Sequence, residues 1–498
     1  MSLKNERKSL EPYLKDSVDF YQHQVSGVRQ MIRMRNFLLA DEMGLGKSLQ
    51  AITVAVADIF QERAEKLLVI APVTLKENWK DEFEKFTTID ATVFGVQPDP
   101  KKPERYKALG PKDRSIQLET FAAQSGPRVL ICNYEQIVRH LHELNGVGFD
   151  IAIFDEAHYL KNPKSKRTQA CHQIQARRNF MLTGTPMLNR VDELWGILHM
   201  IDRKKYSKFW PFVNRYAVFG GFKDKQIIGV KNEKELIEEL HKVMVRRLKE
   251  DVLDLPEVQY IVKRLDLSPG QAKLYSKAED ELEIPLVTED DPVEIENVLT
   301  RLLRLKQICG TTAPFNGVDD STKLDQAIAD ALELIQNDHK VVVFTQFRSV
   351  LRAFSNRFQG GILGVSKDDA EYALWELHGD VPQADRQALV KEWANDSRPG
   401  ALVCMLQVAG VGLNMTAARH ALFLDKLWVP GLNQQAVDRL HRIGQSETQS
   451  VQIIEYHMRG TVEERVEELL TQKSKLFGTI VNDVDFKKKL MRALAERG

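Results

Sequence analysis

The feature of this sequence that most restricts its fold is a short apolar run that leads into a glycine-containing turn and then an amphipathic segment. The apolar run is 37–39, and the turn ends in Lys47 and Ser48. Apolar residues then recur at helical spacing, at Leu49, Ile52, Val56, Ile59 and Phe60. This order predicts a buried strand, a turn and a helix that packs back on the sheet. Backbone N–H groups of such a turn, at a helix N-terminus, point at phosphate oxygens.

The residue types in this turn favour a nucleoside triphosphate as the ligand. Lys47 can reach the β- and γ-phosphates, and the hydroxyl of Ser48 can hold Mg²⁺. The usual pattern begins with glycine, whereas Asp41 occupies that place here. The alternative is a glycine-containing loop that binds nothing, because short motifs also occur by chance. We predict ATP and Mg²⁺ as cofactors, contacted by Asp41, Glu42, Met43, Gly44, Leu45, Gly46, Lys47 and Ser48.

The composition is that of a globular protein with more than one domain. The chain has 498 residues, of which 43% are apolar and 28% are charged. It has no apolar run long enough for a membrane span, and its start lacks the apolar core of a signal peptide. The four cysteines form no Cys-x-x-Cys pair that would suggest zinc or redox chemistry. We therefore expect a cytoplasmic protein with free thiols and no membrane partner.

Charge is balanced over the whole chain but clustered locally. Lys plus Arg and Asp plus Glu number 70 each, so the total charge does not attract a polyanion. Three basic clusters stand out: Lys161, Lys164, Lys166, Arg167, Arg177 and Arg178; Lys242, Arg246, Arg247 and Lys249; and Arg301, Arg304 and Lys306. A cluster of this kind is by default a solvated face. It indicates nucleic-acid binding only if the fold brings the clusters to one groove.

Apolar runs of strand length occur in two sets. The first set is 67–70, 129–132 and 151–154, and the second is 341–344, 402–405, 421–424 and 451–454. Polar turns and helical spacing follow the runs, which predicts two doubly wound parallel sheets and an α/β fold. The second set contains no second phosphate loop. The predicted domains are an ATP-binding lobe at 1–200, a helical insertion and connector at 201–320, a second lobe at 321–460 and bracing helices at 461–498.

Two adjacent carboxylates follow one of the predicted strands. Asp155 and Glu156 come directly after the run 151–154, at the edge of the sheet where the phosphate loop also lies. Asp155 would hold Mg²⁺, and Glu156 would orient and polarise the attacking water. An exposed acidic turn is the weaker interpretation, because the pair follows both an apolar strand and a phosphate loop. The later segment 182–186 offers hydroxyls that could relay the ATP state, although alone it could be an ordinary turn.

Two arginines near the end of the second lobe are candidates for stabilising phosphoryl charge. Arg439 and Arg442 are three residues apart, so they share one face if the segment is helical. Two guanidinium groups on one face suit the charge of a transferring phosphoryl group. The alternative is a surface helix in which Asp438 pairs with Arg442.

The order of these elements resembles that of superfamily 2 helicase-like ATPases, and the details resemble the Swi/Snf family of double-stranded DNA translocases. The phosphate loop 40–48 is similar to the family's loop over nearly its whole length. The segment Val245-Arg-Arg-Leu-Lys249 is similar to a family signature, and Arg439-Leu-His-Arg-Ile-Gly-Gln445 is the most specific motif. The match covers most of the chain. Ser48, where threonine is commoner, and Ala409, where glycine is usual, depart from the family pattern.

The resemblance implies two RecA-like lobes, separated by a helical insertion, that bind ATP and grip duplex DNA. Gln24, in the segment 23–27, would contact the adenine, and Gly412, in the segment 408–414, would contact the nucleotide. Trp79 and Tyr134 lie in segments similar to DNA-facing motifs, although an aromatic residue in an α/β lobe is more often core. The implied DNA contacts are Pro72, Trp79, Tyr134, Lys161, Arg246, Arg247 and Gln346.

We therefore predict a DNA-dependent ATPase that moves along double-stranded DNA and remodels or displaces DNA-bound proteins without separating the strands. Its catalytic residues would be Lys47, Asp155, Glu156, Arg439 and Arg442. Two alternatives stay open, namely a strand-separating DNA or RNA helicase and a slow nucleotide-gated DNA-binding switch. We expect a monomer, of a kind that suits DNA transactions in a bacterium or phage.

Overall fold

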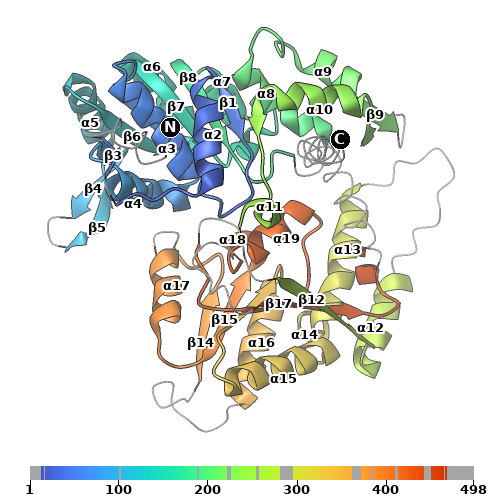
Figure 1. Cartoon of the computed structure of the whole chain (residues 1–498). Coiled ribbons are helices and arrows are strands. Elements are labelled where there is room, and N and C mark those ends of the chain that lie inside the picture. Colours follow the sequence, from blue (N-terminus) through green and yellow to red (C-terminus); the bar gives the residue numbers. More distant parts are fainter. Residues whose placement is uncertain are drawn as a thin grey trace, which may run out of the picture. The chain divides into compact units, whose positions relative to one another are not determined.

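The computed structural model describes residues 13–15, 17–99, 102–187, 190–220, 226–253, 257–280, 295–361, 372–382, 385–409, 413–441, 450–464 and 466–467. These residues fall into two compact units, and the first of them ends at Leu253. Each unit is an α/β structure with its own sheet and its own core (Figure 1). The two α/β lobes predicted from the sequence are confirmed.

The first unit is built on a parallel sheet. Its strands are β1 (Phe37–Leu39), β2 (Lys66–Ala71), β3 (Asp90–Val93), β6 (Arg128–Asn133), β7 (Phe149–Asp155), β8 (Ala176–Leu182) and β11 (Met244–Val245). Within the described residues they are ordered β11-β1-β8-β7-β2-β6-β3. Leu38 lies opposite Met181 on one side and Met244 on the other. Because the strands are parallel, their carboxyl ends lie at one edge of the sheet.

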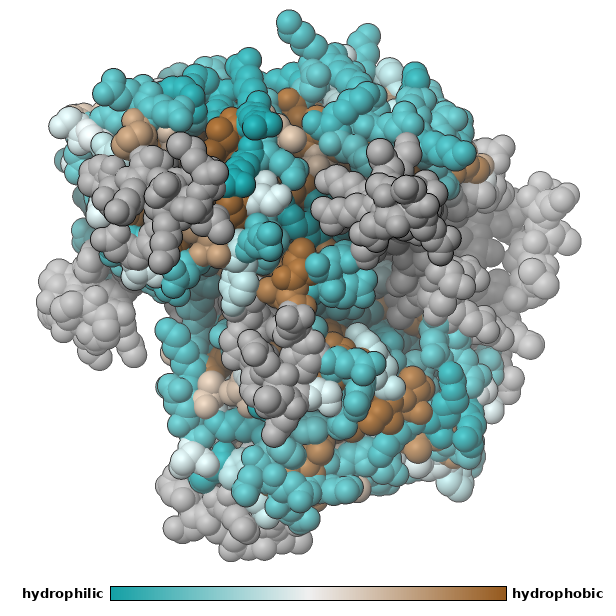
Figure 2. Space-filling model, in the orientation of Figure 1, coloured by the Kyte–Doolittle hydropathy of each residue, from teal (hydrophilic) through white to brown (hydrophobic). Residues whose placement is uncertain are grey.

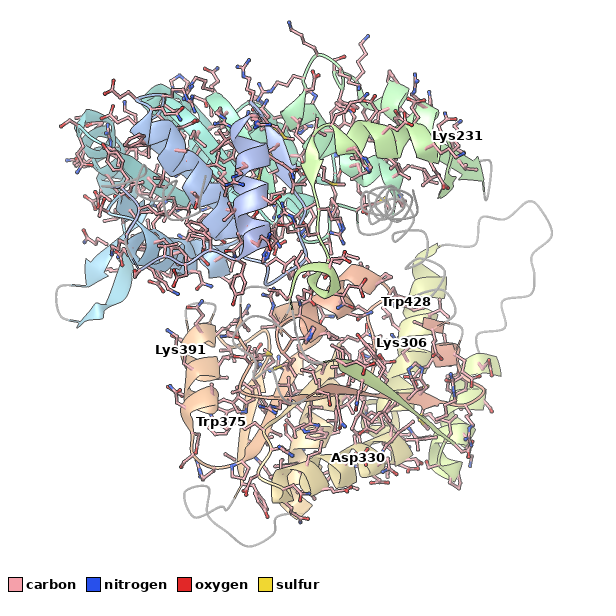
Figure 3. All side chains as sticks on the ribbon, in the orientation of Figure 1. Lys231, Lys306, Asp330, Trp375, Lys391 and Trp428 are labelled. Carbon is pink, nitrogen blue, oxygen red and sulfur yellow. The ribbon has the colours of Figure 1, made fainter. Side chains whose placement is uncertain are left out.

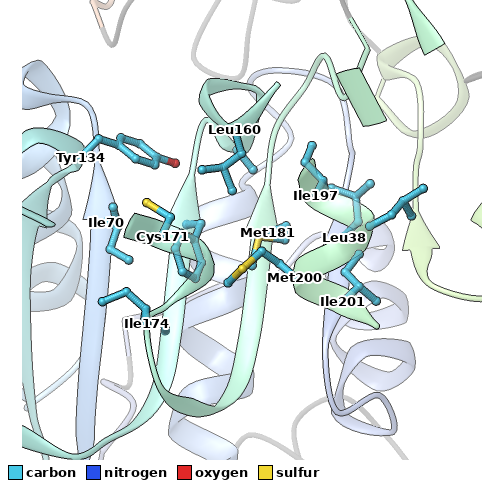
Figure 4. Close-up of a cluster of buried hydrophobic side chains, with 14 of the residues drawn as sticks. Leu38, Ile70, Tyr134, Leu160, Cys171, Ile174, Met181, Ile197, Met200 and Ile201 are labelled. Carbon is cyan, nitrogen blue, oxygen red and sulfur yellow. The ribbon is translucent and has the colours of Figure 1, made fainter. Parts of the chain in front are cut away.

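Helices cover both faces of this sheet. Leu38 packs into one core cluster, whereas Phe37 and Leu39 pack into the other, as expected when successive strand residues point to opposite faces. Figure 4 shows the first of these clusters, in which Met181 and Ile197 lie near Leu38. The helices are α2 (Gln22–Ile32), α3 (Lys47–Phe60), α4 (Lys76–Phe86), α5 (Pro111–Ala123), α6 (Tyr134–Val147), α7 (Lys166–His172), α8 (Trp195–Ile201), α9 (Phe209–Tyr216), α10 (Glu233–His241) and α11 (Lys249–Val252).

Two antiparallel hairpins extend the first unit beyond its main sheet. One pairs β4 (Val96–Asp99) with β5 (Lys102–Ala108), and the other pairs β9 (Ala217–Gly220) with β10 (Gln226–Val230). Single turns of 3₁₀ helix occur at Val73–Leu75, Ala157–Leu160 and Val191–Leu194.

The second unit repeats the parallel architecture. Its strands are β12 (Val258–Leu265), β13 (Val341–Thr345), β14 (Ala373–Leu377), β15 (Gly400–Met405), β16 (His420–Phe423) and β17 (Val451–Met458), and those described are ordered β12-β17-β16-β13-β15-β14. Its helices are α12 (Pro269–Asp280), α13 (Ile295–Gly310), α14 (Ala313–Asn316), α15 (Thr322–Gln336), α16 (Arg348–Gly361), α17 (Arg386–Asn395), α18 (Leu406–Ala409) and α19 (Pro430–Val437). Asp330 of α15, labelled in Figure 3, accepts hydrogen bonds from Lys263 of β12 (2.8 Å) and Tyr456 of β17 (2.6 Å).

The segment 201–320 does more than the predicted helical insertion and connector. It contains six of the described helices above, α9 to α14, but it also supplies β11 to the first sheet and β12 to the second. The two residues of β11 are too few to show a strand pattern. Strand β12 mixes polar and apolar residues because it is a largely exposed edge strand. Strand β14, with a glutamate in its middle, was also missed.

The predicted bracing helices at 461–498 lie largely outside the described residues. At their start, the backbone N–H of Glu463 donates to the hydroxyl of Thr461 (3.2 Å), and that of Gly460 donates to the carboxylate of Glu464 (3.2 Å). The four cysteines are free and buried, as predicted. No helix in the described ranges has the length and apolar character that a membrane crossing requires. In Figure 2, hydrophilic residues predominate on the visible face.

Candidate nucleotide-binding site

The predicted phosphate loop connects β1 to the N-terminus of α3. Gly46 is the residue before the helix and has a φ of 74°, in the left-handed region that favours glycine. A Cβ added to Gly46 would lie 2.3 Å from the side-chain nitrogen of Gln24. No side chain caps the start of α3, and its first turn contains no acidic residue. The first N–H groups of the helix therefore suit an anion such as the phosphates of ATP.

Lys47, the first residue of α3, lies across its own loop. Its Nζ donates to the backbone oxygens of Asp41 (2.9 Å) and Glu42 (3.2 Å). The ammonium group of Lys47 has only donors, so it can transfer these hydrogen bonds to phosphate oxygens. Ser48 follows it and is half-buried. These two residues fit their predicted roles toward ATP and Mg²⁺.

The predicted adenine contact, Gln24 of α2, touches the phosphate loop. Its side-chain nitrogen donates to the backbone oxygen of Leu45 (3.3 Å), and its side-chain oxygen accepts from the backbone N–H of Tyr21 (3.0 Å). The His23 ring also contacts the Leu45 oxygen, at 3.1 Å. Helix α2 therefore supports the loop through residues next to it in space but far from it in sequence.

Asp41, the residue that replaces the usual glycine, anchors the loop in the protein. Its side chain is fully buried, and one carboxylate oxygen accepts from Gln50 (3.0 Å) and from the guanidinium of Arg247 (2.9 Å). A Cβ on Gly27 would overlap Gln50 and Arg247. This glycine therefore permits the close approach of α2, α3 and the segment after β11. We predicted Asp41 as a nucleotide contact, and the structure instead pairs its carboxylate with Arg247, because a buried charge requires a partner.

The residues that follow β11 clamp the same loop. Arg246 donates to the backbone oxygens of Ala40 (2.6 Å) and Gly184 (3.1 Å). The backbone N–H of Glu42 donates to the oxygen of Arg247 (3.0 Å), and the N–H of Lys249 donates to the carboxylate of Glu42 (2.6 Å). The family-like segment 245–249 thus fixes the phosphate loop from a point 206 residues further along the chain.

The two predicted acidic residues lie at the end of β7, which is separated from β1 by β8 alone. Asp155 accepts from the indole N–H of Trp79 (2.8 Å) and from the backbone N–H of Glu156 (2.9 Å). Burial raises the pKa of Asp155 above its usual value, the charge of Glu156 raises it further, and Lys47 and Trp79 partly offset the effect. A carboxylate that is costly to bury as an anion is suited to hold a cation.

Glu156 has a strained backbone conformation and a histidine partner. Its φ is 50°, which is unusual for a residue other than glycine, asparagine or aspartate. Its carboxylate lies 3.1 Å from Nδ1 of His158, which is 3.3 Å from the Thr183 hydroxyl. Thr183 follows β8, and a Cβ on the next residue, Gly184, would lie 3.6 Å from Nζ of Lys47. The acidic pair, the segment 182–186 and the phosphate loop therefore meet at one edge of the sheet.

Most of the predicted DNA contacts are buried. All seven are among the described residues, and of these only Lys161 is exposed. Trp79 (2% exposed) binds Asp155, and the hydroxyl of Tyr134 (0% exposed) donates to the backbone oxygen of Asp155 (2.7 Å). These placements do not fit direct contacts with DNA, because the polar groups are already used inside the protein. Pro72, Arg246, Arg247 and Gln346 are also buried.

The predicted arginine pair does not lie on one described helix. Helix α19 ends at Val437, and Arg439 follows in a turn, where it is 7% exposed. Asp438, which the alternative interpretation paired with Arg442, accepts a hydrogen bond from Gln434 (3.2 Å). Arg442 and Gly412 lie outside the described residues.

Four residues contribute to this site in roles that the sequence did not predict. Gln50, Trp79, Tyr134 and His158 hold Asp41, Asp155 or Glu156 in place, whereas Trp79 and Tyr134 were predicted as DNA contacts. Gln50 and His158 each lie two residues after a predicted residue, so their closeness in sequence was a usable signal. The others act through contacts that depend on the folded chain.

Family comparison supports what the geometry indicates. Residues 21–313, more than half of the chain, match the SNF2-related domain, and residues 323–444 match the helicase conserved C-terminal domain. The chain belongs to the SNF2-related family. The resemblance to Swi/Snf ATPases is thereby confirmed.

Curated relatives match most of this chain but are longer. An uncharacterized ATP-dependent helicase of Mycoplasma pneumoniae is 29% identical over 456 residues, which are 90% of this chain and 40% of the relative. The DNA annealing helicase and endonuclease ZRANB3 of Mus musculus is 29% identical over 493 residues, which are 96% of this chain and 41% of the relative. The chain thus spans about two fifths of their length. The SWI2/SNF2 ATPase core of Sulfolobus solfataricus in complex with double-stranded DNA is 25% identical and covers 93% of each chain, with a TM-score of 0.40, which is too low to carry an argument.

Proposed function

We propose that this chain is an ATPase stimulated by duplex DNA, and that it moves along the duplex and displaces or remodels bound proteins without separating the strands. The observation that supports the ATPase best is the meeting of three strand ends, those of β1, β7 and β8, at one edge of the first sheet. They bring Lys47, the Asp155-Glu156 pair and Thr183 together. Membership of the SNF2-related family, and relatives named as chromatin-remodelling factors or a DNA annealing helicase, support DNA as the partner.

Each residue of the site has a separate proposed role. The N–H groups at the start of α3 and the ammonium of Lys47 would bind the phosphates. Ser48 and Asp155 would hold Mg²⁺, which neutralises phosphate charge when it is bound. Glu156, oriented by His158, would accept a hydrogen bond from the attacking water. Arg246 and Arg247 would keep the loop in its binding conformation.

The deciding experiment is steady-state ATP hydrolysis without nucleic acid and with matched duplex DNA, single-stranded DNA and RNA. Glu156→Gln serves as the blank, because it keeps the size of the side chain but removes its charge. We expect strong stimulation by duplex DNA and almost no turnover in the variant. Normal turnover by Glu156→Gln would contradict the catalytic role of Glu156. If no nucleic acid stimulated hydrolysis, the slow nucleotide-gated switch would be favoured.

Translocation requires a separate measurement. Displacement of a triplex-forming strand from duplex DNA reports movement along the duplex, whereas a forked duplex reports strand separation. We expect triplex displacement without unwinding of the fork. Unwinding of the fork, with stimulation mainly by a single strand, would instead favour the helicase. The roles of Arg439 and Arg442 stay predictions, and each is tested by an alanine variant in the same hydrolysis assay.

A further inference from the structure

A second region of the first unit concentrates positive charge that the nucleotide site does not use. It is a hollow of about 1010 Å³ whose lining includes residues before β1, at the starts of β7 and β8, and after α8 and α10. Its basic lining residues are Arg35, Arg177, Arg203, Lys204 and Lys242, and its acidic one is Asp202. Arg177 and Lys242 belong to two of the basic clusters in the sequence. The fold therefore brings one residue from each of these two clusters to the hollow.

The hollow lies at the opposite edge of the sheet from the nucleotide site. Asn36 directly precedes β1, Phe149 begins β7 and Ala176 begins β8, and all three line the hollow. The phosphate loop and Asp155 lie at the carboxyl ends of the same strands. The seven residues of β8 span about 23 Å between the two edges. The hollow is therefore no part of the ATP site.

The charges in the lining leave an excess of positive charge. Five basic residues against one acidic residue give a formal excess of four positive charges. The Asp202 carboxylate already accepts from the backbone N–H groups of Lys204 (3.0 Å) and Lys205 (2.9 Å). Arg35 and Arg203 donate to the backbone oxygens of Arg177 (3.1 Å) and Ile174 (3.1 Å), which are neutral acceptors. Lys242 is partly compensated, because it pairs with Glu239 at 2.8 Å.

The lining also contains a buried polar atom without a partner. Asn179 is 6% exposed, and its side-chain oxygen has no hydrogen-bond partner among the described residues. Buried polar atoms are nearly always satisfied, so this oxygen indicates a hydroxyl group or a bridging water in the hollow. A hydrated polyanion would meet both features of the lining, because its ordered water can donate to this oxygen while its charge matches the basic residues.

We infer that this hollow binds the phosphate backbone of a nucleic acid, as a second contact separate from the motor's own track. Arginine, lysine and amide side chains are the usual partners of phosphate oxygens. The volume is at the upper end for a small-molecule site, which favours several phosphates over a single nucleotide. The one aromatic residue in the lining, Phe149, is 5% exposed and offers no face for base stacking, so binding is independent of sequence.

The test measures binding of a labelled duplex and a labelled single strand, without ATP, over a range of salt concentrations. The double variant Arg35→Gln with Lys204→Gln removes two exposed charges of the hollow. The control, Lys231→Gln with Lys234→Gln, removes two exposed charges that do not line it (Lys231 is labelled in Figure 3). We expect the slope of log K against log salt for duplex DNA to fall by about 1.8 in the first variant only, at about 0.9 for each lost phosphate contact.

A photo-crosslinking residue at Gln175, which is exposed and lines the hollow, provides an independent readout. We expect it to capture labelled nucleic acid, and an excess of polyglutamate not to prevent the capture. An unchanged salt slope, an equal change in the control, or displacement of nucleic acid by polyglutamate would overturn the inference. The inference does not depend on turnover. A chain that crosslinks nucleic acid at 175 but shows no DNA-stimulated hydrolysis would retain the contact and lose the proposed motor.

Discussion

The two units contain the same kind of parallel sheet, but they use a lysine near its carboxyl edge in opposite ways. In the first unit, Lys47 donates to the neutral backbone oxygens of its own loop. In the second unit, Lys323 is fully buried and donates to the backbone oxygen of Leu424 (2.8 Å) and to the carboxylate of Glu463 (2.6 Å). A lysine locked in a buried ion pair holds the fold together. A lysine on neutral acceptors can bind an incoming anion.

The acidic residues at the two edges show the same difference. Asp425 follows β16 in the second unit, and its carboxylate accepts from the backbone N–H of Gln346 (3.0 Å) and from the hydroxyl of Thr345. Asp155 in the first unit has a raised pKa and lies next to a second carboxylate. The Asp425 carboxylate is therefore satisfied within the second unit. A parallel sheet alone therefore does not make a nucleotide site, since the loop and the acidic pair must be added.

The largest effect on stability should come from the buried ion pair of the second unit. Lys323→Met leaves Glu463 buried without its partner, so we expect the second unit to lose about 3–5 kcal/mol in urea unfolding. The double variant Lys323→Met with Glu463→Leu should recover most of this loss, because both charges are then absent. If the single variant were as stable as the parent, the comparison between the two lysines would fail.

The matched change in the first unit should affect activity instead. Lys47→Met removes a charge that stabilises the transferred phosphate, so we expect hydrolysis to fall by about 10²–10³-fold. The unfolding free energy should change by less than about 1 kcal/mol, since the hydrogen bonds that are lost go to neutral backbone oxygens. Urea unfolding and hydrolysis measured on the same preparation check both statements, and a large loss of stability would contradict them.

The clamp on the phosphate loop should show coupling between two distant residues. Arg247→Met leaves Asp41 buried with Gln50 as its remaining described partner, so we expect a loss of about 3 kcal/mol and weaker ATP binding. Asp41→Gly combined with Arg247→Met removes both charges and restores the usual glycine. Urea unfolding and nucleotide titration of the single and double variants measure the coupling, and simple additivity of the two changes would speak against a clamp.

A smaller effect distinguishes two possible roles of Trp79, the positioning of Asp155 and direct contact with DNA. Trp79→Phe keeps the aromatic packing but removes the N–H that donates to Asp155. We expect kcat to fall about 10-fold, which corresponds to about 1.4 kcal/mol, while the Kd for duplex DNA stays the same. A weaker Kd with an unchanged kcat would return Trp79 to the role of a DNA contact.

The two units should also share a dependence of stability on pH. Burial, together with a neighbouring histidine, lowers the pKa of His172 in the first unit and of His420 in the second to about 4. The unfolded chain binds these protons near pH 6.5, whereas the folded chain does not until about pH 4, so stability falls as the pH falls between these values. We expect a loss of about 2 kcal/mol for each histidine between pH 7 and pH 5. Unfolding at pH 7 and 5 should show a weaker dependence in His172→Gln and His420→Gln.

Local patterns predicted the fold and the centre of the site well. Each of these features is continuous in sequence: the phosphate loop, the Asp155-Glu156 pair and the strands around them. The spacing of their apolar residues and the residue types in their turns can therefore be recognised directly. The partners of these groups could not be predicted in the same way. Trp79 reaches Asp155 across 76 residues, and Arg247 reaches Asp41 across 206. For such side chains the residue type suggested DNA contact, and only the tertiary structure shows that a buried acceptor uses them.

The clamp also has a consequence for the time course of synthesis. Asp41 leaves the ribosome 206 residues before Arg247, its charged partner. At about 5–20 residues per second, that interval lasts roughly 10–40 seconds. During this interval the Asp41 carboxylate has no guanidinium partner, and β11 is not yet available to pair with the edge of β1. The ATP site, which begins near the start of the chain, is therefore among the last parts of its unit to be completed.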